Sequence, residues 1–207
     1  MADISPGQFP TNPSFESVNF RIVTPTIVSE TNSGKLRRVG YGHSYYTFDV
    51  KYPYLTYNQA GTVNSFVATA QGPLFSFEIV LPEVSYSDAP DAVTANATIT
   101  TSGNLTYGAK TMTVSNCGAN KTVMQPGDYF KFANHSKVYM CTTTVTSNGS
   151  GVANVTFSGS LVTNVPSGTR MTITAVPFTV VLAEQTQEYM VSTRGITNLT
   201  LSMREVW

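Results

Sequence analysis

Residues 178–184 read FTVVLAE, and they echo residues 77–83, which read FEIVLPE. Both segments are rich in aromatic and β-branched residues, which is typical of strands. So short a match can arise by chance. It also fits two strands of one sheet, placed where the chain leaves a domain and where it returns to that domain after an insertion.

The residues between these two segments differ in amino-acid composition from the rest of the chain. Residues 82–93 are rich in Ser, Asp, Ala and Pro, which suggests a crossover between domains. From residue 95 to 174 aromatic residues become sparse, while Thr, Asn and Gly increase. Turn signals there separate short strands at intervals of about 8–12 residues, as in a small sandwich or barrel. The predicted strands are 111–115, 129–133, 137–145, 152–157 and 170–175.

The flanking regions predict a different β domain that contains one helix. Alternating aromatic residues predict a strand over 46–52. Thr56 and Gln59 form a capping box, which begins a helix over about 56–71. A closing strand is predicted over 199–206, where apolar and polar residues alternate again.

The predicted fold is therefore mostly β and discontinuous. A β-sandwich-like domain with one α-helix comprises residues 1–86 plus 176–207. It carries an inserted small β-barrel or sandwich domain, which comprises residues 87–175.

Charged residues are scarce and balanced. They make up 12% of the chain, and the formal net charge is +0, whereas typical domains contain about 25% charged residues. A surface rich in Thr, Ser and Asn suits permanent assembly, and the missing surplus of Lys and Arg argues against nucleic-acid binding. Lys35, Arg37 and Arg38 form a short basic cluster, which we interpret as a solvated turn or an inter-subunit salt bridge rather than a DNA contact.

Other sequence signals are negative. The chain contains no stretch of about 18 apolar residues, so no membrane-spanning segment is expected. Its N-terminus resembles no signal peptide. Cys117 and Cys141 are expected to be two buried free thiols.

The residues that carry chemistry do not form a recognisable constellation. His43 and His135 lie in predicted turns without a partner at metal-ligand spacing. Carboxylates are scattered, and Glu184 and Glu188 come nearest to a pair. No phosphate-binding loop or nucleophile elbow is present. We therefore expect no catalytic, cofactor-binding or metal-binding residues, and no enzyme activity.

Several motifs resemble those of bacteriophage distal tail proteins and baseplate ring components. An arginine-glycine stretch leads into an aromatic strand and a Tyr-Pro-x-Leu-Thr helix start, and a Gly-Asp-Tyr-Phe-Lys-Phe hairpin is followed by His-Ser-Lys-Val-Tyr. The matching stretches are 38–53, 55–56, 72–77, 125–132, 134–140 and 147–151. Together they span most of the chain, and none of them is a catalytic signature.

This resemblance implies a structural protein of the virion, located in the viral tail after assembly in the host cytoplasm. Members of the family form a β-rich homo-hexameric ring that joins the tail tube to the baseplate hub, and their second domain faces outward. Two alternatives stay open. One is a carbohydrate-binding module of a tail fibre or baseplate, and the other is a head–tail connector or tail terminator.

Both ends of the chain contain residues suited to inter-subunit contacts. Residues 5–15 include three prolines, which favour extended backbone and oppose helix formation. Phe9 and Phe15 in this segment, and Trp207 at the C-terminus, are candidate interface anchors, because aromatic side chains dominate many interfaces. The alternative is that these ends are frayed.

Overall fold

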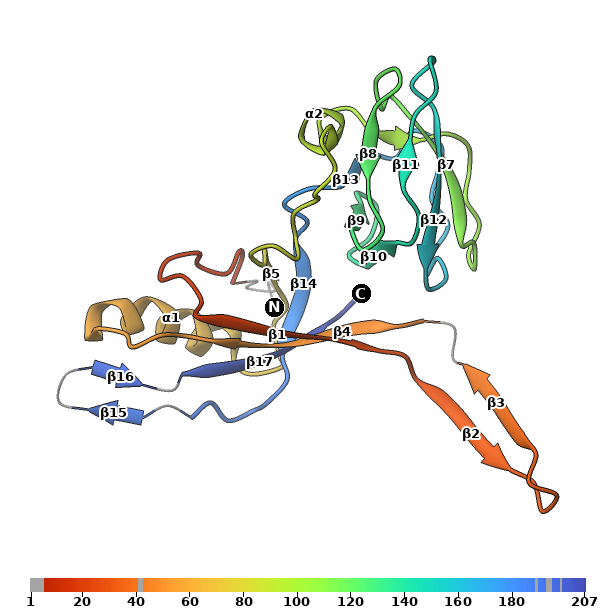
Figure 1. Ribbon diagram of the computed structural model, residues 1–207. Helices are drawn as coiled ribbons and strands as arrows, with labels where there is room; N and C mark the ends of the chain where they lie inside the picture. The colour runs from red at the N-terminus through yellow and green to blue at the C-terminus, as the bar shows by residue number, and fades with distance from the viewer. Residues whose placement is uncertain (1–5, 41–42, 189, 193–194, 198) are drawn as a thin grey trace, which may run out of the picture. The chain divides into compact units, whose positions relative to one another are not determined.

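The computed structural model describes residues 6–40, 43–188, 190–192, 195–197 and 199–207. The fold is mostly β, as predicted, with two helices in the part of the chain that is described (Figure 1). Contacts divide the chain into two compact units. The first unit comprises residues 1–22, 45–81 and 177–207, and the second comprises residues 23–44 and 82–176.

The first unit is built on a five-stranded sheet in the order β1-β4-β17-β14-β5. Its strands are β1 (Ser17–Val23), β4 (Tyr45–Lys51), β5 (Phe77–Ile79), β14 (Phe178–Leu182) and β17 (Thr200–Glu205). β14 pairs antiparallel with β5, so that Phe178 lies opposite Ile79. The two segments that echo each other in the sequence are therefore neighbours in one sheet. A hairpin of β15 (Met190–Ser192) and β16 (Gly195–Thr197) lies between β14 and β17 in the chain.

Alternation along these strands buries one face of the sheet. Tyr46, Phe48 and Val50 of β4 are each at most 2% exposed, and so are Leu201 and Met203 of β17, the strand beside it. Their neighbours in the sequence point to the other face, because successive side chains of a strand alternate. This pattern confirms the strand predicted over 46–52.

Local interactions set both ends of helix α1 (Tyr57–Ala70). Gln59 Oε1 accepts hydrogen bonds from the backbone N and the Oγ1 of Thr56, at 3.0 and 2.9 Å. The helix ends at Gln71 and Gly72, which both adopt the left-handed conformation that stops helices. Phe66 of α1 packs edge-on against Phe77 of β5, with ring centroids 5.1 Å apart. The helix predicted over 56–71 is confirmed.

The N-terminal segment extends the sheet beyond β5. The backbone N of Phe9 donates to the carbonyl of Glu78 at 2.7 Å, and the N of Glu78 donates to the carbonyl of Gly7 at 3.1 Å. The Phe9 ring is 2% exposed, and it lies between Phe66 and Phe77. This segment therefore closes one end of the sheet with its own backbone and an aromatic side chain.

The second unit contains a six-stranded sheet in the order β13-β9-β10-β12-β7-β6. Its strands are β6 (Thr100–Thr101), β7 (Thr111–Ser115), β9 (Tyr129–Phe132), β10 (Val138–Cys141), β12 (Ala153–Ser158) and β13 (Met171–Thr172). A bridge between Thr100 and Arg170 links the two ends, so the sheet nearly closes into a barrel. β8 (Thr122–Met124) pairs with β11 (Val145–Thr146), and α2 (Ala92–Asn96) precedes β6.

An aromatic cluster fills the core of the second unit. Phe130, Phe132, Tyr139 and Phe157 are each at most 3% exposed, and their ring centroids lie 5.3–5.7 Å apart where they touch. The two cysteines are buried free thiols, as predicted; they are Cys117 and Cys141.

The boundaries of the second unit differ from those expected from the amino-acid composition along the chain. It begins at Pro82 rather than at residue 87, and it also takes in residues 23–44. His43 explains part of this grouping, because its ring contacts Tyr107 and the carbonyl of Ser160.

We predict that Phe9→Ala lowers the free energy of unfolding of the first unit by about 3 kcal/mol, because it empties a buried aromatic site. Denaturant unfolding followed by fluorescence or circular dichroism measures the loss. Gln8→Ala is the matched control, since Gln8 is exposed and its backbone pairing is retained. A loss below about 1 kcal/mol for Phe9→Ala would show that the segment does not dock in this way.

Candidate functional site

The two histidines make structural contacts. His43 places Nδ1 3.3 Å from the carbonyl oxygen of Ser160 and Nε2 3.1 Å from the hydroxyl of Tyr107. His135 places Nε2 2.9 Å from the hydroxyl of Tyr139. No group of three His, Cys, Asp or Glu side chains in the described residues is arranged to hold a metal ion.

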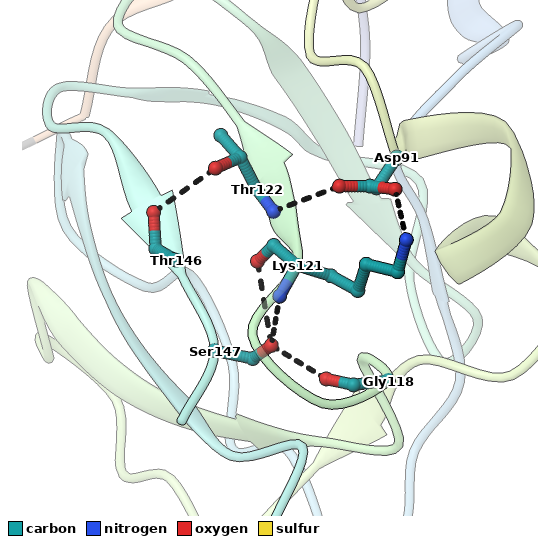
Figure 2. Close-up of polar contacts among 6 residues, drawn as sticks. All are labelled: Asp91, Gly118, Lys121, Thr122, Thr146 and Ser147. Atoms are coloured by element: carbon teal, nitrogen blue, oxygen red, sulfur yellow. Dashed lines mark hydrogen bonds and ion pairs between the residues drawn. The ribbon is translucent and has the colours of Figure 1, made fainter. Parts of the chain in front are cut away.

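A polar cluster in the second unit ties α2 to β8 and to neighbouring loops (Figure 2). One carboxylate oxygen of Asp91 lies 2.8 Å from Lys121 Nζ, and the other accepts the backbone N–H of Thr122 at 3.1 Å. The Lys121 hydrogen bond holds the pKa of Asp91 below its usual value. Ser147 Oγ donates to the carbonyl of Gly118 at 2.5 Å and accepts the N–H of Lys121 at 2.9 Å. These groups satisfy one another, so the cluster joins segments of the fold.

A shallow hollow of about 600 Å³ lies beside this cluster. It is lined by small and polar residues: Thr98, Asn116, Gly118, Ala119, Gly149, Ser150 and Gly151. Carbohydrate sites usually present aromatic side chains to the sugar, and this lining contains none. The hollow therefore gives no support to a glycan site.

An exposed hairpin, residues 26–40, is a second candidate surface, and we call it the arm. It consists of β2 (Thr26–Glu30) and β3 (Leu36–Gly40), which pair in register from end to end. The turn is closed by Thr31, which bonds to Lys35 through both backbone and side chain, and Gly34 supplies the positive φ that the turn requires. Every residue of both strands is exposed.

The arm exposes apolar side chains on both of its faces. Ile27 and Val39 lie directly opposite each other, and they are 50% and 65% exposed. Val28 and Leu36, on the other face, are each 57% exposed. An isolated two-stranded hairpin is marginally stable in water, and contiguous exposed apolar side chains mark interaction sites.

The arm also carries unpaired positive charge. Its cations are Lys35, Arg37 and Arg38, and Glu30 is its one carboxylate. None of the three cations forms an ion pair in the described part of the chain. Arg37 lies on the same face as Ile27 and Val39, because alternate residues of a strand share a face.

The structure places the three predicted anchors in different surroundings. Phe9 and Phe15 lie together, with ring centroids 6.1 Å apart, and Phe15 packs edge-on against Tyr52. Phe9 is thus committed to the core of its own chain, whereas Trp207 is 49% exposed. A contact of these residues with a neighbouring subunit stays a prediction.

Sequence reasoning missed the four apolar side chains of the arm. A signal was present, because Asn32-Ser33-Gly34 separates two five-residue runs that contain β-branched residues, a pattern typical of a hairpin. The basic cluster was noticed, but its place on one strand of a hairpin was not.

A scan against models of known protein families finds no match, and a search of curated proteins finds no significant match. Among the described residues, none of the helices has the length and apolar character needed to cross a membrane.

We predict that limited trypsin digestion cuts the arm first, after Lys35, Arg37 or Arg38. All three are exposed on a ribbon of two strands, where local opening costs little free energy. Mass spectrometry of the earliest fragments identifies the sites. Earlier cleavage after Lys110, which is also exposed but precedes β7 of the barrel-like sheet, would contradict this expectation.

We also predict that His135 makes the stability of the protein depend on pH. Burial, with Lys131 and Lys137 near by, lowers the pKa of His135 from 6.5 to about 4. The unfolded chain therefore takes up a proton that the folded chain refuses as pH falls from about 6.5 to about 4. The free energy of unfolding should fall by about 1–3 kcal/mol across this window. Below it, His135 should cause no further decrease.

Denaturant unfolding at several pH values, compared between the wild type and His135→Gln, measures this effect. The difference isolates His135 from carboxylates that titrate near the lower end of the window. Parallel pH profiles for the two proteins would show that His135 titrates normally.

Proposed function

We propose that this chain is a structural subunit that assembles with copies of itself through the arm, as a ring-forming component of a bacteriophage tail tip or baseplate. The arm is the observation that carries the assembly part of this proposal. The motif resemblance supports the phage-tail part, in which a homo-hexameric ring links the tail tube to the baseplate hub. No enzymatic role is proposed.

Energetics favour a partner for the arm. Burying the exposed portions of Ile27, Val28, Leu36 and Val39 would contribute on the order of 4 kcal/mol. Ordering a two-stranded hairpin that has no third strand or packing partner is unfavourable or neutral in free energy. An interface that covers the arm would both order it and remove its apolar side chains from water.

The sheet of the first unit offers a further contact that suits a ring. β1 is its terminal strand, and the opposite end, beyond β5, is covered by the chain's own N-terminal segment. The two ends of the sheet are thus different, and a ring requires two different surfaces that meet head to tail. Strand addition at a sheet edge is a common way to make such contacts.

We predict that the purified protein forms a closed oligomer and that Ile27→Ser/Val39→Ser shifts it to monomers. Both side chains are exposed in the single chain, so the melting temperature should change little. Native mass spectrometry and light scattering over a range of concentrations give the mass. Val93→Ser is the control, since Val93 is an exposed apolar residue outside the arm. A monomer at every concentration, together with absence from purified particles, would refute assembly.

Location in the particle tests the phage-tail part separately. Antibodies against the chain, applied to particles from the strain that carries its gene, should label the tail tip in electron micrographs. Label at the head–tail junction would instead favour a connector or tail terminator, and label along fibres would favour a fibre module.

A further inference from the structure

A groove on the first unit lies where the end of α1 meets the chain after β14. It is lined by Gln71, Pro73, Leu74 and Gln185 and has a volume of about 470 Å³. We call it the Leu74 groove. Leu74 is 65% exposed. Gly72 has a positive φ and packs against the chain at Gln185, where a Cβ would lie at an ordinary van der Waals distance of 3.4 Å from the Cα of Gln185.

Unpaired negative charge accompanies this groove. Glu184 adjoins Gln185 in the chain, and Glu188 follows four residues after Glu184. The side chain of Gln187 donates a hydrogen bond through Nε2 to the carbonyl of Glu184. Both glutamates are exposed, and neither forms an ion pair in the described residues.

Three other carboxylates of the first unit are already engaged. Asp49 pairs with Arg21, and Glu16 lies 3.0 Å from Lys51 Nζ. Glu205 is 1% exposed and accepts the backbone N–H of Tyr46. A fourth, Glu78, is exposed on β5. Glu184 and Glu188 are thus the exposed carboxylates beside the groove, and they form no ion pair in the described residues.

The arm has the complementary pattern on one face only. Ile27 and Val39 form an apolar pair there, and Arg37 is the charge beside them. The other face also has apolar side chains, but it combines Arg38 with Glu30, so its charges offset each other. The face that contains Arg37 is thus the one suited to an apolar groove bordered by carboxylates.

We infer that the Leu74 groove of one copy receives the arm of another copy, with Ile27 and Val39 over Leu74 and Pro73, and Arg37 toward Glu184 and Glu188. This inference rests on the proposed function, because it requires copies of the chain to assemble. It assigns the basic cluster to a salt bridge between subunits, and it makes the contact heterologous, as ring closure requires.

Charge reversal tests the pairing. Arg37→Glu alone, and Glu184→Lys/Glu188→Lys alone, should each weaken self-association by about tenfold or more, because like charges then face each other. The triple variant, or an equimolar mixture of the two reversed proteins, should restore assembly, since every interface in it again pairs opposite charges. Analytical ultracentrifugation gives the association constants.

Two matched controls use charges of the same kind elsewhere. Arg38→Glu changes the opposite face of the arm, and Glu83→Lys/Asp88→Lys changes exposed carboxylates in the second unit. Both should leave assembly within about threefold of the wild type. Loss of assembly with Glu83→Lys/Asp88→Lys, and none with Glu184→Lys/Glu188→Lys, would overturn the inference.

Cross-linking tests proximity directly. The native cysteines are buried, so Ile27→Cys and Leu74→Cys provide accessible thiols on separate molecules. A short bismaleimide should join these two variants when they are mixed, and it should join Val93→Cys to Leu74→Cys much less. If the wild type assembles but Ile27→Cys and Leu74→Cys do not cross-link above the control, the groove is wrong while the proposed function stands. If the wild type does not assemble, both fail.

Discussion

The structure depends on the antiparallel pairing of β14 with β5. These strands are separated by about half of the chain, and their ladder places Phe178 opposite Ile79. β17 then pairs with β4, which encloses the aromatic and aliphatic side chains of the first unit's core. Such long-range pairing carries a loop-closure cost, which grows slowly with the length of the loop. An insertion that folds as a compact unit reduces that cost, because it removes most of the freedom of the intervening loop.

Features set by local chemistry could be predicted from the sequence. The capping box of Thr56 and Gln59 fixed the start of α1, and β7 spans the predicted residues 111–115. The arm was missed because neither of its faces is buried. Ile27 and Val28 therefore follow each other without the alternation that identifies a half-buried strand.

The candidate site was predicted only in part, for a related reason. Prolines in residues 5–15 indicate an extended segment. They do not specify whether it joins the sheet of its own chain or that of a neighbouring subunit. Phe9 fits a pocket of its own chain, and the same aromatic chemistry would serve a neighbour equally well. The basic cluster at Lys35, Arg37 and Arg38 is visible in the sequence. Which apolar side chains share a face with it can be assigned only from the register of the hairpin.

The pairing of β5 with β14 has a consequence for the evolution of the chain. Adjacent antiparallel strands lie about 4.8 Å apart, so the insertion leaves and returns across a single strand spacing. Backbone bonding between Val176 and Ser85 holds the two connecting segments together just inside the insertion. A tight turn, or an unrelated domain with adjacent termini, meets the same geometric requirement. The sheet can therefore keep its architecture while the inserted domain is exchanged, which makes this position a natural site for diversification.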